Sequence, residues 1–339
     1  MSGRGAGISR VYLLALVSLA ACKREISPGP IAAYDAAVGL PERADAAAST
    51  QVQDAGNSVQ NALVPQYAGD SPMATWRSAK GIGHTSTVYL LKGDNDQTRM
   101  VFKPDTRHGP GRYRGEIAAR QLALAFGIGD RVPQVVSASF ERGPLRGVLP
   151  GPKARADFDA DVMAQGDFVY GAGIAWVDGL QFPALHRGPA RAEWEGWITG
   201  KDPVPAEKRE LAKSISDMVM FDYITGNFDR WSGGNIGQVG NAHSPVLYID
   251  NDGAFLWPEP REHLERQAAL MRRTSKFSER LSAPIGTAAV DPQFAARVLT
   301  LPPPLQPFGP ELLRAVQRRL VEVAAHMQRV CDAGPCVIL

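Results

Sequence analysis

The most regular hydrophobic pattern in the chain lies between residues 206 and 226. Apolar side chains recur there at intervals of three and four residues, and a glycine follows them. This spacing places the side chains on one face of a helix that the glycine ends. The face consists of Leu211, Ile215, Met218, Val219 and Asp222. The pattern predicts a helix from about Ala206 to Gly226.

Two short apolar runs follow this helix. IGQV (236–239) and VLYI (246–249) are separated by the turn-rich GNAHSP, which predicts an antiparallel hairpin. Because the two ends of a hairpin lie side by side, Asn235 and Asp250 are expected at one edge, with Asp229 on the loop that leads there. Two carboxylates and a carboxamide suit a hard cation such as Mg²⁺ or Mn²⁺. Turns use the same residue types, so a hairpin bordered by solvated polar residues is the alternative.

A small sheet followed by a helix is predicted nearer the N-terminus. Residues 88–91 and 100–102 form two apolar runs, and RYRGEIAARQLALAFGIG predicts a helix that its glycines end. Lys103 closes the second strand and Glu116 lies in the first turn of the helix. A strand lysine and a helix glutamate form the ion pair that fixes nucleotide phosphates in kinases, whereas a solvated strand end is the alternative for the lysine. Gly81 and Gly83 precede the first strand, where backbone N–H groups could cover a phosphate.

The remaining pattern is less regular. VVSASF (135–140) and FVYGAGIAWV (168–177) predict strands, and GIGDRVP (127–133) is assigned a structural role at the end of the preceding helix. Further helices are predicted over 262–273, 291–301 and 310–330. Residues 143–205 otherwise have no clear period. A hinge between two lobes lies either just after Leu149 or at 175–179, and the second position is favoured because the first leaves strand 168–177 without a partner.

The polar segments carry a resemblance to a known family. GNFDRWSGGNI and YIDNDGAF resemble the catalytic and metal-binding segments of secretory-pathway kinases of the four-jointed and Golgi casein kinase type. They are similar, more distantly, to phosphoinositide kinases and HipA-type toxin kinases. FKP and GEIAARQLA also resemble the four-jointed type. The resemblance implies an α+β, two-lobed, protein-kinase-like fold with a small β-rich N-terminal lobe and a larger helical C-terminal lobe.

The same resemblance implies a role for each candidate residue. Asp229 corresponds to the catalytic base, Asn235 to a metal ligand, and Asp250 to the aspartate that holds Mg²⁺ or Mn²⁺ on the phosphates of ATP or another nucleotide. Lys103 corresponds to the lysine that binds the phosphates, with Glu116 as its partner. The glycines at 81 and 83 correspond to a glycine loop that is shorter than the full motif.

These roles predict phosphoryl transfer to the hydroxyl group of a protein or of a small molecule such as a sugar. Trp231 stands where these families often have histidine. ATP is also scarce outside the bacterial inner membrane, where the export signal described below would place the protein. Both points favour the alternative of a pseudokinase, which keeps the fold as a nucleotide-binding or scaffold module.

The N-terminus predicts export. Arg4 and Arg10 precede a short apolar stretch over 11–21, which is too short to span a bilayer because spanning takes about 20 residues. The ending LAAC resembles the lipobox of bacterial lipoproteins and implies lipidation of Cys22, with an ordinary signal peptide as the alternative. Lys23 after the cysteine favours the outer membrane of a Gram-negative cell envelope. The lipid anchor is the expected membrane contact.

Composition divides the chain. Residues 1–21 form the signal, 22–75 a disordered linker, 76–180 the N-terminal lobe and hinge, and 181–339 the C-terminal lobe. Removing Arg4 and Arg10 with the signal lowers the net charge from +2 to zero, and no nucleic-acid partner is expected.

Cys331 and Cys336 are expected to form a disulfide, because Cys22 carries lipid and the compartment is oxidising.

Overall fold

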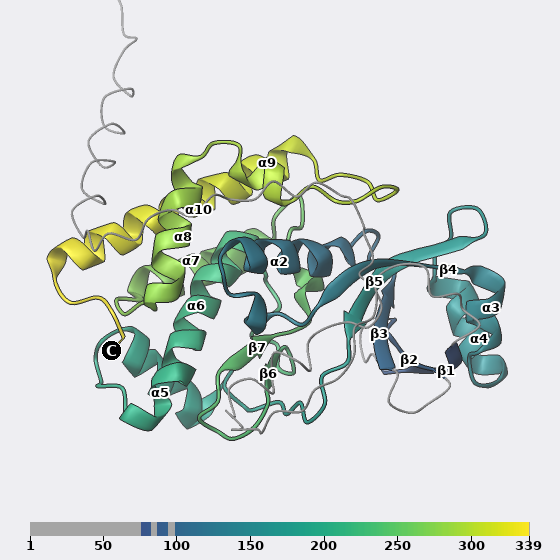
Figure 1. Ribbon diagram of the computed structural model, residues 1–339, viewed down its shortest axis with the longest axis horizontal. Helices are drawn as coiled ribbons and strands as arrows, with labels where there is room; N and C mark the ends of the chain where they lie inside the picture. Colours follow the sequence, from purple (N-terminus) through teal and green to yellow (C-terminus); the bar gives the residue numbers. More distant parts are fainter. Residues whose placement is uncertain (1–75, 83–86, 94–98, 339) are drawn as a thin grey trace, which may run out of the picture. The chain divides into compact units, whose positions relative to one another are not determined.

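The computed structural model describes residues 76–82, 87–93 and 99–338, and within these ranges five antiparallel strands form the sheet of an N-terminal lobe (Figure 1). The strand order is β1-β2-β3-β5-β4. The strands are β1 (Trp76–Gly81), β2 (Tyr89–Gly93), β3 (Arg99–Pro104), β4 (Val135–Glu141) and β5 (Phe168–Ala175). Strand β1 was not predicted, because only two of its six residues are buried. The predicted signal, Cys22, the linker and Gly83 lie outside the described residues.

Two helices between β4 and β5 share an apolar core with the sheet. They are α3 (Arg142–Gly147) and α4 (Gly151–Asp161). Each buries a single side chain, Leu145 and Phe158 respectively, against sheet residues such as Phe102. A helix with one buried position has no hydrophobic period, which is why the sequence predicted neither.

The chain leaves the sheet directly after β5. Ala175 is the last residue of that strand, and Gln181 already pairs with Gln238 at the end of β6. The crossing therefore runs through residues 176–180, which overlap the hinge position at 175–179 that the sequence favoured. Strand β5 is the strand that a hinge just after Leu149 would have left without a partner. In the structure it pairs on both sides, with β3 and with β4.

The C-terminal lobe is built around α6 (Arg209–Thr225), which is buried over most of its length. Gly226 ends this helix with φ of 67°, a left-handed conformation that favours glycine. The hairpin of β6 (Ile236–Gln238) and β7 (Val246–Tyr248) follows, which confirms the prediction. The other elements of the lobe are α5 (Gly188–Ile198), η4 (Ala206–Lys208), η5 (Asn251–Gly253), α7 (Arg261–Arg273), α8 (Glu279–Val290), α9 (Phe294–Val298) and α10 (Pro310–Ala333).

Helix α2 (Arg114–Ala125) lies between the sheet and the helices of the C-terminal lobe (Figure 1). Its buried residues Ala118, Leu122 and Ala123 belong to the core of the C-terminal lobe. Ile117 instead packs with Leu301 and with sheet residues. The short η3 (Gly129–Arg131) then leads to β4. The helix that carries Glu116 is thus shared by both lobes.

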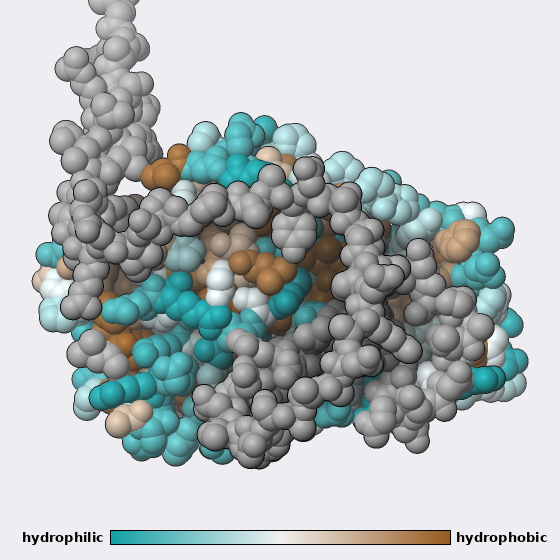
Figure 2. Space-filling model, viewed as in Figure 1, coloured by the Kyte–Doolittle hydropathy of each residue, from teal (hydrophilic) through white to brown (hydrophobic). Residues whose placement is uncertain are grey.

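The protein surface is mixed in character. Some large apolar side chains are exposed among the described residues, and Figure 2 shows brown areas interspersed with teal on the face in view. No helix in the described part of the chain is long and apolar enough to cross a membrane. A disulfide joins Cys331 and Cys336 at the end of α10, the pair expected from the sequence because Cys22 was assigned to lipid and the compartment is oxidising.

Candidate active site

Arg230 is the central side chain of the loop between α6 and the hairpin. It is fully buried, and its Nε donates to Asp222 Oδ2 at 3.0 Å. Its Nη1 donates to the carbonyl oxygens of Asn235, at 2.6 Å, and of Ile249. Its Nη2 donates to Asn251 Oδ1 at 2.6 Å. One guanidinium therefore joins α6, both ends of the hairpin and the segment that follows.

The partner carboxyl on α6 is equally buried. Burial raises the pKa of Asp222 to about 6, although the adjacent Arg230 lowers it. Asp222 is therefore ionised at neutral pH and provides the counter-charge that a buried guanidinium needs.

Asp229 is held by hydrogen bonds on two sides. Its N–H donates to Asn227 Oδ1 at 3.1 Å, and Asn235 Nδ2 donates to its carbonyl oxygen and to Oδ2, both at 3.0 Å. Asn235 Nδ2 also lies 3.3 Å from Ser232 Oγ. A Cβ on Gly253 would lie 3.0 Å from Asp229 Cβ, so glycine permits this close approach. The structure thus brings the predicted base and the predicted carboxamide ligand into contact.

Lys103 lies among three carboxylates at the end of β3. Its Nζ donates to Glu116 Oε1 at 2.6 Å and to Asp250 Oδ1, and Asp252 Oδ2 lies 3.4 Å away. The predicted lysine–glutamate pair is present. The three acidic residues come from α2 and from the segment after β7, which are remote from each other in the sequence.

The charges in this cluster support one another. Burial disfavours the ammonium of Lys103, but Glu116, Asp250 and Asp252 outweigh it and hold the lysine pKa above its ordinary value. Burial raises the pKa of Glu116, while Lys103 opposes the increase. Lys103 therefore carries its charge throughout the physiological range.

The first turn of α2 packs directly on the segment after β7. A Cβ on Gly115 would lie 2.6 Å from the carbonyl oxygen of Asn251, so a larger residue would displace the helix. Asn251 Nδ2 donates to Tyr248 O at 3.0 Å and lies 3.4 Å from Glu116 Oε2. Since Arg230 holds Asn251 Oδ1, the loop of the predicted base and the lysine cluster form one connected network.

Sequence reasoning missed four residues of this network. Arg230, Asn251, Arg112 and Asp252 lie within the quoted motifs, but the sequence analysis assigned none of them a role. Arg112 Nη2 donates to Asp252 Oδ1 at 3.0 Å, and its Nε donates to Asp252 O at 3.2 Å. The one available signal was the second acidic residue in YIDNDGAF.

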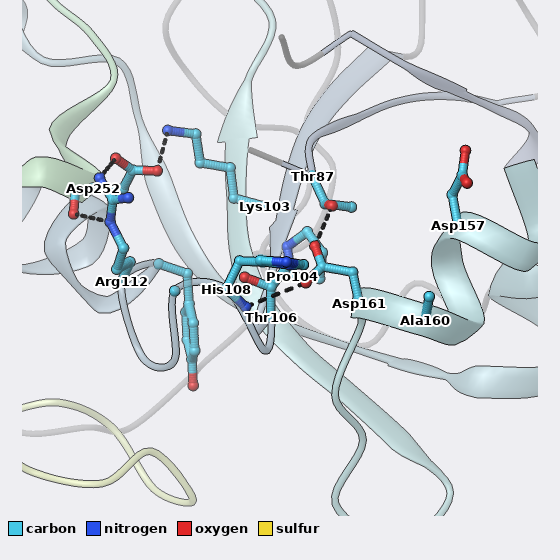
Figure 3. A pocket seen from close by; sticks show the side chains of 12 residues that line it. Thr87, Lys103, Pro104, Thr106, His108, Arg112, Asp157, Ala160, Asp161 and Asp252 are labelled. Atoms are coloured by element: carbon cyan, nitrogen blue, oxygen red, sulfur yellow. Dashed lines mark hydrogen bonds and ion pairs between the residues drawn. The ribbon is translucent and has the colours of Figure 1, made fainter. Parts of the chain in front are cut away.

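A cavity of about 460 Å³ opens beside the lysine cluster (Figure 3). Of the predicted site residues that the structure describes, Lys103 lines it. Gly81 closes β1 and is not part of the lining. The other lining residues are Thr87, Pro104, Thr106, His108, Gly109, Arg112, Tyr113, Asp157, Ala160, Asp161 and Asp252.

The donor set fits a divalent cation. Glu116, Asp250 and Asp252 together exceed the positive charge of Lys103 and Arg112, and carboxylate oxygens are the ligands that Mg²⁺ and Mn²⁺ prefer. The side chain of Asp250 is 37% exposed, so it can turn toward a cation. Within residues 76–82, 87–93 and 99–338, no three His, Cys, Asp or Glu side chains are grouped to enclose a metal by themselves.

Trp231 points into the C-terminal lobe. Its ring stacks on Trp194 with centroids 5.1 Å apart, and the guanidinium of Arg191 lies 5.3 Å from its ring centroid. The departure from histidine at this position thus adds to the core and leaves the contact between Asp229 and Asn235 intact.

The segment 127–133 has the structural role that the sequence assigned. Arg280 on α8 donates to Asp130 Oδ2 at 2.9 Å and to Gly127 O at 2.7 Å. These contacts fasten the end of α2 to the C-terminal lobe.

Comparison with known proteins identifies the fold. No protein-family model and no curated protein matches the chain. A solved structure of the Golgi casein kinase with Mn/ADP bound is similar at a TM-score of 0.58 and 16% identity, covering 82% of this chain and 77% of that one. A structure of hydra Fam20 with sugar is similar at a TM-score of 0.58 and 19% identity, covering 78% of this chain and 89% of that one.

The chain has a kinase-like fold. A second structure of the Golgi casein kinase agrees, with a TM-score of 0.57, 16% identity and coverage of 79% and 77%. At these identities the likeness concerns the fold. The kinase-like fold accounts for the order of the elements: a small antiparallel sheet, the shared helix α2, the hinge, and a helical lobe that carries the hairpin.

Proposed function

We propose that the protein transfers the terminal phosphoryl group of ATP, or of another nucleotide, to a hydroxyl group in the presence of Mg²⁺ or Mn²⁺. The observation that carries the proposal is the contact of Lys103 with Glu116 and Asp250, from three separate segments of the chain. Arg230 and Asn251 connect this cluster to the loop of Asp229. A kinase-like fold with these groups in contact favours phosphoryl transfer.

The residues divide the chemistry among them. Lys103 binds phosphate oxygens while Glu116 keeps its ammonium oriented. Asp229 accepts the proton of the acceptor hydroxyl, and the amide of Asn235 orients its carboxylate. Asp250 and Asn235 would hold the cation, with Glu116 as a further contact. The bound cation would neutralise charge on the phosphates.

The acceptor is a hydroxyl of a protein or of a small molecule such as a sugar. Of the similar structures, one contains Mn and ADP and another contains sugar, which supports these classes as the first to test. The intact contact of Asp229 with Asn235 favours an enzyme over a pseudokinase. Export, lipidation of Cys22 and location at the outer membrane belong to the same proposal, and mass spectrometry of the membrane-extracted protein would test them.

The decisive experiment measures ADP release from ATP by the purified protein with Mg²⁺ or Mn²⁺. Asp229→Asn and Asp250→Asn preserve side-chain size and remove one charge each. Asp167→Asn is the matched control, because Asp167 is exposed on the sheet lobe.

Loss of turnover in both site variants, with the control unaffected, is the expected result. Metal-dependent ATP binding without turnover in the unmodified protein, across protein and sugar acceptors, would favour the pseudokinase. Absence of nucleotide binding would exclude the kinase and the nucleotide-binding pseudokinase, and would leave only the scaffold module.

A further inference from the structure

The register of the sheet shows that the cavity and the hinge lie at opposite ends of β3. In the pairing of β3 with β5, Met100 lies opposite Ala175, the last residue before the chain crosses to the C-terminal lobe. Lys103 and Pro104 lie at the other end of β3 and line the cavity. A nucleotide with its base at the hinge and its phosphates at Lys103 therefore directs its terminal phosphate into the cavity.

The walls of the cavity differ in charge. Lys103 and Arg112 lie on one side with Asp252 between them, and Asp157 and Asp161 lie on the opposite side (Figure 3). Both cations contact the carboxylate of Asp252. Its Oδ2 lies 3.4 Å from Lys103 Nζ, and its Oδ1 lies 3.0 Å from Arg112 Nη2. A phosphate entering past Lys103 thus meets a second cation on the same wall.

Arg112 is held in place by three contacts. Its Nε and Nη2 donate to the carbonyl oxygen and the carboxylate of Asp252, and its guanidinium lies 5.8 Å from the ring centroid of Phe228. Phe228 directly precedes Asp229. The side chain of Arg112 remains 33% exposed, and among the described residues its hydrogen bonds are made by Nε and Nη2 and none by Nη1. One donor group of an otherwise fixed guanidinium is therefore available to a ligand.

We propose that Arg112 binds the terminal phosphoryl group of the nucleotide, beside Lys103. The inference rests on the proposed nucleotide function and adds a residue to it. A guanidinium that is already fixed loses little conformational entropy when it binds, and its planar donors suit phosphate oxygens. Charge that develops on the transferred group would be stabilised by the same contact.

Neighbouring cations do not share this position. Arg107, on the same loop, is exposed and does not line the cavity. Arg114 donates to Gln306 O at 3.0 Å and lies over Phe308. His108 lines the cavity, but its Nδ1 is 2.6 Å from Asp161 Oδ1 on the opposite wall. Among Arg107, Arg112 and Arg114, the geometry selects Arg112.

The test compares two ligands that differ in the terminal phosphate. Calorimetric titration with Mn²⁺ measures the affinity of the full chain for ADP and for a non-hydrolysable ATP analogue. Arg112→Gln is expected to lower the affinity for the ATP analogue roughly tenfold, which is the effect of losing one charge-assisted hydrogen bond. The affinity for ADP is expected to change less than about twofold. Arg107→Gln, the same substitution on the same loop, is expected to change neither affinity.

The outcomes separate this inference from the function on which it rests. Equal weakening of both ligands by Arg112→Gln would assign Arg112 to positioning Asp252 and overturn the proposal, as would no weakening of either. If Arg112→Gln does not fold, Arg112→Lys keeps the charge and is expected to weaken the analogue alone, by roughly threefold. If the unmodified chain binds neither ligand, the proposed function itself fails.

Discussion

Arg230 and Asp222 form an ion pair from which solvent is excluded: Nε lies 3.0 Å from Oδ2, and the exposed fractions of the two side chains are 0% and 2%. The pair connects the end of α6 to the hairpin through the other donors of Arg230. A buried pair of this kind contributes little net stability when intact, but removal of one partner leaves an uncompensated charge. Because Arg230 directly follows the candidate base Asp229, we expect the geometry of the base to depend on this pair.

Replacement of Arg230 by methionine tests this dependence. The side chain keeps its approximate size, but Asp222 loses its partner, so the free energy of unfolding should fall by about 3–5 kcal/mol. Urea denaturation measures the change. Lys153→Met removes an exposed pair, in which the two side chains are 87% and 64% exposed, and should change the free energy by less than about 0.5 kcal/mol. Equal effects of the two substitutions would contradict the central role of Arg230.

Removal of the charge of Asp250 tests the metal site. The predicted consequence of Asp250→Asn is a loss of Mn²⁺ affinity, measured with ADP present, of roughly tenfold or more, because a neutral amide is a weaker ligand than a carboxylate. Electron paramagnetic resonance of free Mn²⁺ gives the affinity directly. Asp167→Asn should leave it unchanged. Unaltered Mn²⁺ affinity in Asp250→Asn would transfer the ligand role to another carboxylate of the cluster.

Asp217 on α6 makes stability depend on pH. Burial raises its pKa from 3.8 to about 7, although Arg131, Ser278 and Arg280 oppose the increase. A carboxyl whose folded pKa is raised contributes stability that is full below about pH 4 and is lost as the pH rises through 7. Asp217→Asn does not titrate, so its melting temperature should exceed that of the unmodified protein by several degrees at pH 8 and approach it at pH 4.

Differential scanning fluorimetry across this pH range measures the effect. Asp167→Asn again serves as the control, since an exposed carboxyl has little effect on stability at any pH. A difference between Asp217→Asn and the unmodified protein that is the same at pH 4 and pH 8 would exclude Asp217 as its source.

The segment after α9 holds α2 in place. Leu305 is 7% exposed and packs with Ile117 of α2, and Gln121 Nε2 donates to Thr300 O at 2.9 Å. Leu305→Ala should lower the free energy of unfolding by about 2–4 kcal/mol. It should also weaken nucleotide binding, because Glu116 lies on the same helix.

A matched control exists on α2 itself. Leu124 is 56% exposed, so Leu124→Ala should change the free energy of unfolding by less than about 0.5 kcal/mol. Nucleotide affinity that is unchanged in Leu305→Ala would indicate that the C-terminal segment stabilises the fold without positioning Glu116.

Several features were predictable because they depend on local pattern. The helical period that ends at Gly226 and the two runs around GNAHSP specify a helix and a hairpin through spacing and turn chemistry alone. The pairing of Lys103 with Glu116 was also accessible, since both lie on adjacent elements 13 residues apart. Helices α3 and α4 were not, because each buries one side chain and leaves no period to detect.

The sequence by itself determined which residue types were available and which elements carry them: Lys103 at a strand end, Glu116 in a first helical turn, and Asp229, Asn235 and Asp250 around a hairpin. Only the tertiary structure decided that Arg112 and Asp252 meet across 140 residues. It also decided that Arg230 joins α6 to the segment after β7. Local periodicity reports which face of an element is buried, whereas contacts between remote polar side chains arise from packing of whole elements, which spacing along the chain does not encode.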